Sequence, residues 1–212
     1  MSTPLRQAAC AALLALAAPP LAAQAPHQTM VLAGGCFWGM QYVFEHVAGV
    51  TGVTAGYAGG TSQAADYETV SGGATGHAES VRIEFDPAVV SYETLLDVFF
   101  TVAHDPTELN RQGPDVGTQY RSVVFFADTT QQRIAQEVIH RLDRSGAFGK
   151  PIVTQVAPLA GFYRAEAYHQ DYAERHPTDP YIAYNDLPKL GVLKAKFPRL
   201  FRAEPRLAVG SD

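Results

Sequence analysis

The sequence predicts an α+β fold, a ferredoxin-like sandwich in which split βαβ units form a mixed sheet and helices cover one of its faces. The hydrophobic pattern supports this class because it changes repeatedly between the strand period of two and the helical period of about 3.6. Composition agrees, since 212 residues with 47% apolar and 17% charged side chains suit one compact domain with a real core.

The first βαβ unit begins with a short apolar run at 29–33, which favours a buried strand and ends at two glycines. Apolar residues then recur at spacings of three and four across 36–47, which predicts an amphipathic helix. A second strand is expected at 50–57, followed by a long polar loop to about residue 76. The apolar positions of the helix are Phe37, Met40, Val43, Phe44 and Val47.

The second half repeats the order of strand and helix. Clean alternation at 78–85 predicts a strand, and after a turn Ser91 is placed to cap a helix over 92–103. Strands at 120–126 and 152–156, helices at 131–142 and 165–175, and a long loop at 104–119 complete the prediction. From about residue 176 five prolines favour an irregular extension. Long loops in a small domain usually carry function.

The first 25 residues have the pattern of a secretory signal peptide, with Arg6 before an apolar run at 8–18 and small residues near the expected cleavage position. We therefore expect a single catalytic domain at 26–212, exported to the periplasm or secreted. No later segment has 18 consecutive apolar residues, so no stable membrane association is expected. A net charge of −5 without a basic cluster argues against nucleic-acid binding.

Cys36 is the first candidate for chemistry, because removal of the leader also removes Cys10 and leaves one thiol in an oxidising compartment. Such a thiol is either buried for structural reasons or retained for a reaction. It follows Gly34 and Gly35 and opens the first helix, where free N–H groups and the helix dipole stabilise a thiolate. This position predicts a lowered pKa and a nucleophilic role.

Glu79 is the second candidate, because it shares a strand face with apolar residues that should enter the core. Burial disfavours an ionised carboxylate, so the pKa of Glu79 should rise and the group can serve as a proton donor. The alternative is a strand end at which this face has already reached water. Tyr67, Tyr120 and Tyr172 carry hydroxyls that can bind an oxygen atom, although single tyrosines more often serve packing.

Four ordered motifs resemble one family. Gly35-Cys36-Phe37-Trp38-Gly39 resembles the GCFWG motif of the A-type peptide methionine sulfoxide reductases. The further matches are Thr75-Gly76-His77-Ala78-Glu79, the stretch from Asp115 to Ser122 that contains Gly117-Thr118-Gln119-Tyr120-Arg121, and Ala165-Glu166 followed by His169-Gln170 and Tyr172. The resemblance extends from about Met30 to about Lys189.

The resemblance implies a thiol-dependent repair enzyme that reduces methionine S-sulfoxide, free and in proteins. Cys36 would attack the sulfur while Glu79 protonates the oxygen, with hydrogen bonds from Tyr67 and Tyr120, and a Cys36 sulfenic acid would result. It further implies an apolar pocket at Phe37 and Trp38 for the substrate methyl group. Asp115 would arrange the thiolate and a water, and Tyr172 would line the same site.

The chain departs from the family pattern because it lacks the resolving cysteines that many members carry toward the C-terminus. We therefore expect no bound cofactor and reduction of the sulfenic acid by an external thiol, either a thioredoxin-like protein or a small dithiol.

Two other functions stay open from the residues alone, and a third is not expected. A cysteine hydrolase or acyltransferase would use Cys36 with His77, His104 or His169 as base. A metal site is not expected, since the histidines show no ligand spacing. A binding module without catalysis would not need the thiol, so its function would survive Cys36→Ser.

Overall fold

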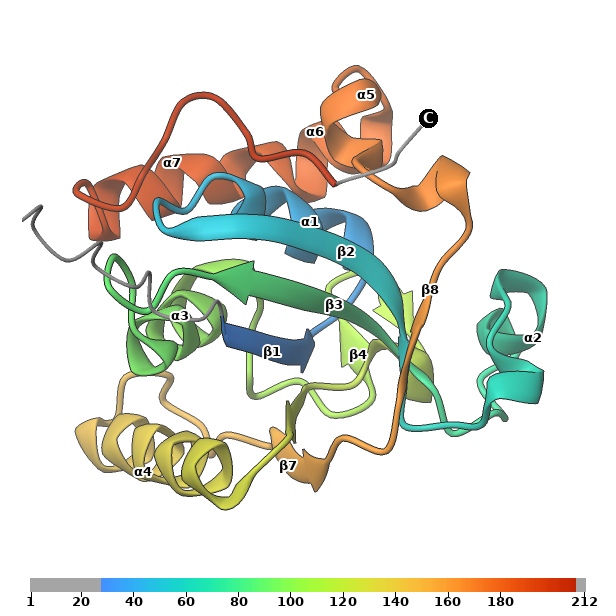
Figure 1. Cartoon of the computed structure of the whole chain (residues 1–212), viewed down its shortest axis with the longest axis horizontal. Coiled ribbons are helices and arrows are strands. Elements are labelled where there is room, and N and C mark those ends of the chain that lie inside the picture. The colour runs from blue at the N-terminus through green and yellow to red at the C-terminus, as the bar shows by residue number, and fades with distance from the viewer. Residues whose placement is uncertain (1–27, 209–212) are drawn as a thin grey trace, which may run out of the picture.

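The computed structural model describes residues 28–208 and contains a six-stranded mixed sheet with the order β7-β6-β1-β3-β2-β8 (Figure 1). Neighbouring strands are antiparallel except for the parallel pair of β6 and β7. The central order β6-β1-β3-β2 is that of a ferredoxin-like sandwich, which confirms the predicted fold class. The strands are β1 (Gln28–Ala33), β2 (Val50–Ala58), β3 (Ala78–Phe85), β6 (Val123–Phe126), β7 (Gln155–Pro158) and β8 (Phe162–Arg164).

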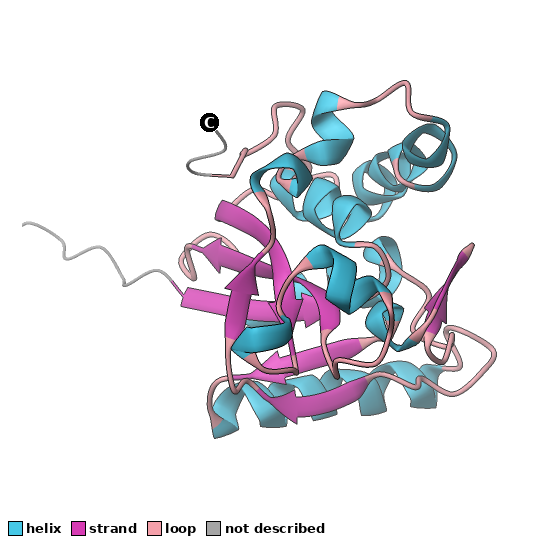
Figure 2. Ribbon diagram, turned by 90° about the vertical axis from the view of Figure 1, so that its right-hand side faces the viewer, coloured by secondary structure: helices cyan, strands magenta, loops and turns pink. Residues whose placement is uncertain are grey.

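The main hydrophobic core joins one face of this sheet to α1 (Phe37–Glu45), α3 (Tyr92–Val98) and α4 (Thr129–Ser145). In strand β3 successive side chains point to opposite faces of the sheet. Val81 and Ile83 are fully buried in the main core. Arg82 is half-buried on the other face and lies over the ring of Phe162. All five apolar positions predicted for the first helix are buried. Figure 2 shows these helices packed around the magenta strands.

The C-terminal part differs from its prediction. In place of an irregular segment from about 176, the chain forms α6 (Pro180–Asn185) and α7 (Leu187–Lys196), and α7 runs beside α1 (Figure 1). Pro180 and Pro188 stand in the first turns of these helices, where the backbone N–H that proline lacks has no helical partner. Irregular chain follows only after α7.

The helix expected over 165–175 is interrupted. A short 3₁₀ turn at Ala167–His169 is separated from α5 (Tyr172–Arg175) by Asp171, whose φ of 53° lies in the left-handed region. This conformation cannot continue a right-handed helix. Tyr172 consequently opens its own helical turn.

Both predicted loops contain short elements. The first includes α2 (Tyr67–Ser71), and the second includes the two-stranded ribbon of β4 (Arg111–Gln112) and β5 (Asp115–Val116). The strand expected from residue 120 starts at Val123, because Thr118–Tyr120 forms a 3₁₀ turn. The helix expected to reach residue 103 ends as a π turn at Phe99–Ala103.

Within residues 28–208 every helix is too short or too polar to cross a bilayer. The predicted signal peptide at 1–25 lies outside the described residues and stays a prediction.

Candidate active site

Cys36 lies in the tight connection between β1 and α1, where it occupies the N-cap position of the helix. Gly35, with a φ of +95°, makes the turn that brings the thiol to the start of α1. The backbone N–H of Trp38, at the start of the helix, favours the ionised form of the thiol. Cys36 itself is half-buried.

The predicted lowering of the Cys36 pKa is wrong. Burial and the neighbouring carboxyl groups of Glu79 and Asp186 hold the pKa of the Cys36 thiol well above its ordinary value, and the single N–H of Trp38 does not offset them. The sequence shows the helix start but not the acidic groups that the fold collects around it. The resting thiol is therefore protonated at neutral pH.

Glu79 is buried, with 3% of its surface exposed, as its place on the apolar face of β3 predicts. Its carboxylate accepts a hydrogen bond from the Phe37 N–H at 3.0 Å, and its side chain lies close enough to Cys36 to interact with the thiol. Burial nevertheless raises the pKa of Glu79 to about 8. This confirms a carboxyl group that holds a proton at neutral pH beside the thiol.

Tyr67 and Tyr120 lie close enough to Cys36 and Glu79 to interact electrostatically with both. Burial and the charge of Glu79 raise the pKa of both phenols, so each hydroxyl remains a hydrogen-bond donor at neutral pH. Glu166 anchors the loop that carries Tyr67: its carboxylate accepts one hydrogen bond from the backbone N–H of Tyr67 at 2.9 Å and another from the Tyr57 hydroxyl at 2.9 Å.

An aromatic wall lies beside the thiol. The rings of Trp38 and Tyr172 stack with centroids 3.8 Å apart and planes 13° from parallel. The indole N–H of Trp38 donates to Nδ1 of His169 at 3.1 Å, which fixes the face of the indole. Phe37 is only 1% exposed and packs on Tyr57 and His169, so it belongs to the core beneath the wall more than to its surface.

A small cavity of about 80 Å³ opens on Cys36 from the side of α6 and α7. Asp115 lines it and accepts a hydrogen bond from the Tyr181 hydroxyl. Asp186 and Lys189 line it as well and form an ion pair at 3.1 Å. Sequence reasoning missed Tyr181, Asp186 and Lys189, because all three belong to the segment that was expected to be irregular. Proline at a first helical position was the signal that could have identified these helices.

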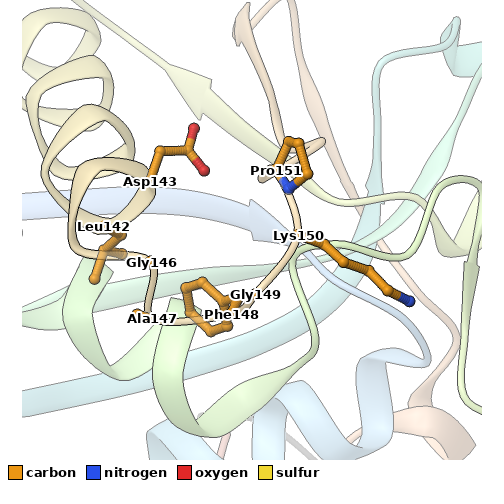
Figure 3. Close-up of a pocket in the computed structure, with 8 residues that line it drawn as sticks. All are labelled: Leu142, Asp143, Gly146, Ala147, Phe148, Gly149, Lys150 and Pro151. Atoms are coloured by element: carbon orange, nitrogen blue, oxygen red, sulfur yellow. The ribbon is translucent and has the colours of Figure 1, made fainter.

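A hollow of about 470 Å³ lies elsewhere, at the C-terminal end of α4 (Figure 3). Its lining runs from Leu142 to Pro151 and contains no cysteine, histidine or tyrosine. It shares no residue with the candidate site, so its size carries no functional weight.

The histidines expected of a cysteine hydrolase are occupied. His77 contacts the Gly60 N–H and the Thr61 carbonyl, and His104 contacts the Phe99 carbonyl and the Ser122 hydroxyl. His169 accepts from Trp38, as described above. Across residues 28–208, no three His, Cys, Asp or Glu side chains lie together as a potential metal site.

A ferredoxin-like sandwich with a thiol and a protonated carboxyl group at one helix start defines a thiol-dependent oxidoreductase suited to substrates whose oxygen must be protonated. Comparison with known proteins gives the family. The sequence profile of "Peptide methionine sulfoxide reductase" matches residues 28–199, so the chain belongs to the peptide methionine sulfoxide reductase family and is an enzyme that reduces methionine sulfoxide.

Related proteins match this chain in sequence along most of their length. A peptide methionine sulfoxide reductase MsrA 2 from Mesorhizobium japonicum is 53% identical over 185 residues, which cover 87% of this chain and 95% of the relative. The enzyme of the same name from Synechocystis is 49% identical over 82% of this chain and 81% of its own. Methionine sulfoxide reductase A of Corynebacterium diphtheriae has a similar structure, with a TM-score of 0.67 at 34% identity over 72% of this chain and 76% of its own.

Proposed function

We propose that this chain reduces the S epimer of methionine sulfoxide, free and in proteins, with Cys36 as nucleophile and Glu79 as proton donor. The observation that carries the proposal is a thiol beside a buried carboxyl group, which the Phe37 N–H holds at the helix start and whose pKa of about 8 keeps it protonated at neutral pH. A sulfoxide becomes a good electrophile only when its oxygen receives a proton. The pair provides the attacking sulfur and that proton side by side.

The raised pKa values of Cys36 and Glu79 fit a proton relay in which the net charge of this pair stays zero. Glu79 gives its proton to the sulfoxide oxygen, and the thiol proton of Cys36 passes to Glu79 as the Cys36 sulfur attacks the substrate sulfur. The S–O bond then breaks as the oxygen, with its proton, moves to Cys36. The products are methionine and a Cys36 sulfenic acid, and Glu79 ends protonated as it began.

The surrounding residues support the two reacting groups. The Tyr67 and Tyr120 hydroxyls are placed to bind the sulfoxide oxygen as charge develops on it. The stacked rings of Trp38 and Tyr172, over the buried ring of Phe37, offer an apolar surface for the methyl group. Asp115, held by Tyr181, keeps a polar group on the other side of the thiol.

The second half of the cycle requires an external thiol. Cys36 is the only cysteine among residues 28–208, and Cys10 belongs to the predicted leader. The sulfenic acid is then reduced to a mixed disulfide and back to the thiol by a thioredoxin-like protein or a small dithiol.

Oxygen loss from each epimer of a methionine sulfoxide peptide, with a simple dithiol as reductant, tests the function. Wild type should convert the S epimer alone, and Cys36→Ser should convert neither while keeping its circular dichroism spectrum. Conversion by Cys36→Ser, or ester hydrolysis by wild type without methionine release, would overturn the proposal.

We also propose export through cleavage of a signal peptide at residues 1–25. The support is the leader pattern and the family match, which begins at residue 28. Cell fractionation of the full chain, with sequencing of the mature N-terminus, tests this proposal. Retention of the leader in the cytoplasmic fraction would contradict it.

A further inference from the structure

The cavity on the α7 side of Cys36 differs in character from the aromatic wall on which the substrate methyl group would rest. Its lining is polar and charged, and it includes Cys36, Asp186 and Lys189 but not Glu79 or Trp38. A charged lining disfavours a methyl group, because the groups around it would lose hydration without a partner. Its carboxyl groups can take up or give a proton, and its one ammonium, that of Lys189, can stabilise an anion.

Asp186 is the unusual member of this lining. It is 1% exposed, and Oδ1 is paired with the Lys189 ammonium, while Oδ2 is buried and has no hydrogen-bond partner. A buried carboxylate oxygen without a donor is costly, so such an atom normally has a functional reason. Asp186 is also close enough to Cys36 to raise the pKa of the thiol.

The GCFWG motif provides the space for this pair. A Cβ atom at Gly39 would lie 2.0 Å from Oδ1 of Asp186 and 2.7 Å from Nζ of Lys189. Only glycine therefore allows the ion pair to reach the first turn of α1, three residues after the nucleophile. The helices α6 and α7 bring the pair there from the far end of the sequence.

We propose that Asp186 and Lys189 form the acid–base site at which the external thiol reduces the Cys36 sulfenic acid. This inference rests on the proposed function, because it needs a sulfenic acid and a reductant thiol. Asp186 takes the proton from the incoming thiol, and the Lys189 ammonium stabilises the thiolate that results.

The chemistry balances without a further reagent. The thiolate sulfur attacks the Cys36 sulfur, an S–S bond forms, and the S–O bond breaks. Asp186 returns its proton to the departing hydroxide, which leaves as water. A second thiol then attacks the mixed disulfide and regenerates the Cys36 thiol, so two thiols are oxidised to one disulfide while one sulfenic acid is reduced.

The test separates the two half-reactions in wild type, Asp186→Asn and Lys189→Gln. Methionine released by one equivalent of sulfoxide peptide without reductant measures the first. The rate at which β-mercaptoethanol removes the oxygen from Cys36, followed by mass spectrometry, measures the second. Asp128→Asn is the matched control, since Asp128 stands at the N-cap of α4 as Asp186 stands at that of α7, and asparagine caps equally well.

We expect Asp186→Asn to slow sulfenic acid reduction by about 100-fold or more, within the range for general acid–base catalysis, and Lys189→Gln to slow it less. Methionine release should change much less, by about threefold, because Asp186 acts on Cys36 in that step only through its charge while Glu79 moves the protons. Release of methionine also shows that the variants are folded. The control should match wild type in both steps. Equal slowing of both steps, or unchanged reduction in Asp186→Asn, would overturn the inference. If wild type releases no methionine, the proposed function fails instead.

Discussion

The two ends of helix α1 each hold a buried glutamate, and the comparison separates a reactive acid from a structural one. At the N-terminal end Glu79 is 3% exposed, accepts a hydrogen bond from the Phe37 N–H and lies beside Cys36. At the C-terminal end Glu45 is fully buried near Asp171, and neither of its carboxyl oxygens has a hydrogen-bond partner. Both carboxyl groups keep a proton at neutral pH.

The groups next to Glu45 and Glu79 account for the difference between their pKa values. Burial raises the pKa of Glu45 to about 10, and the nearby Asp171 and Glu174 carboxylates add to the effect. The same cause brings Glu79 only to about 8, because the N–H of Phe37 and the thiol of Cys36 favour its ionised form. The positive end of the helix therefore keeps Glu79 close to the pH at which it works.

The two glutamates also differ in whether a reacting group lies beside them. The C-terminal segment covers the end of α1 at Glu45, where the Arg206 N–H donates to the Glu45 carbonyl and the Ala208 N–H donates to Asp171. Glu79 instead lies beside a half-buried thiol. The comparison teaches that a raised pKa alone does not identify an active-site acid, since the acid must also lie next to a group that reacts.

The largest expected effect is on chemistry at the N-terminal end. Glu79→Gln keeps a hydrogen-bonding side chain but has no acidic proton, so single-turnover methionine release should fall by about 10²–10⁴-fold. Alkylation of Cys36 by iodoacetamide should continue. Glu137→Gln, on the exposed surface of α4, is the control and should behave as wild type. Normal turnover in Glu79→Gln would remove Glu79 from its proposed role.

At the C-terminal end the expected effect is on stability. Folded Glu45 holds a proton at pH 7 that an unfolded glutamate, with a pKa near 4.3, has released, which costs about 4 kcal/mol. Because the folded pKa is the higher one, this cost is absent below about pH 4.3 and grows as the pH rises toward about 10.

Glu45→Gln should therefore be more stable than wild type at pH 8, by urea unfolding, and lose most of that advantage near pH 5. Methionine release should stay within about twofold of wild type, because Glu45 does not contact the site. A variant that is less stable at pH 8 would show that the Glu45 proton does not carry this cost.

A smaller effect should arise in the aromatic wall. Trp38→Phe keeps a ring against Tyr172 but loses the N–H that donates to His169, a bond that contributes about 1 kcal/mol. We expect a KM for the sulfoxide peptide about fivefold higher, with kcat changed less. A fall in kcat at constant KM, measured by steady-state kinetics, would place Trp38 in the chemical step instead.

Local patterns predicted the parts of the molecule in which the sequence determines its own surroundings. The strand at Ala78–Phe85 and the burial of Glu79 followed from alternation alone, because a strand with one face in the core has no freedom of register. The four central strands were predicted for the same reason, and the helices between them were predicted from apolar residues at spacings of three and four.

Long-range contacts account for what was missed. The pKa of Cys36 depends on Asp186, 150 positions later in the chain, and no local pattern reveals that approach. Tyr181 and Lys189 reach the site through helices whose prolines favoured irregular chain, although a first helical turn accepts proline. Strand β8 is three residues long and completes the sheet edge through tertiary pairing with β2.

The most direct test of the Glu79 proton is the pH dependence of methionine release in a single turnover without reductant. The donor must be protonated, so the wild-type rate should be level below about pH 8, the pKa of Glu79, and fall as the pH rises through it. The slow residual rate of Glu79→Gln should show no such fall. A wild-type rate that is unchanged or rises through pH 8, or a variant that keeps the same inflection, would contradict the account.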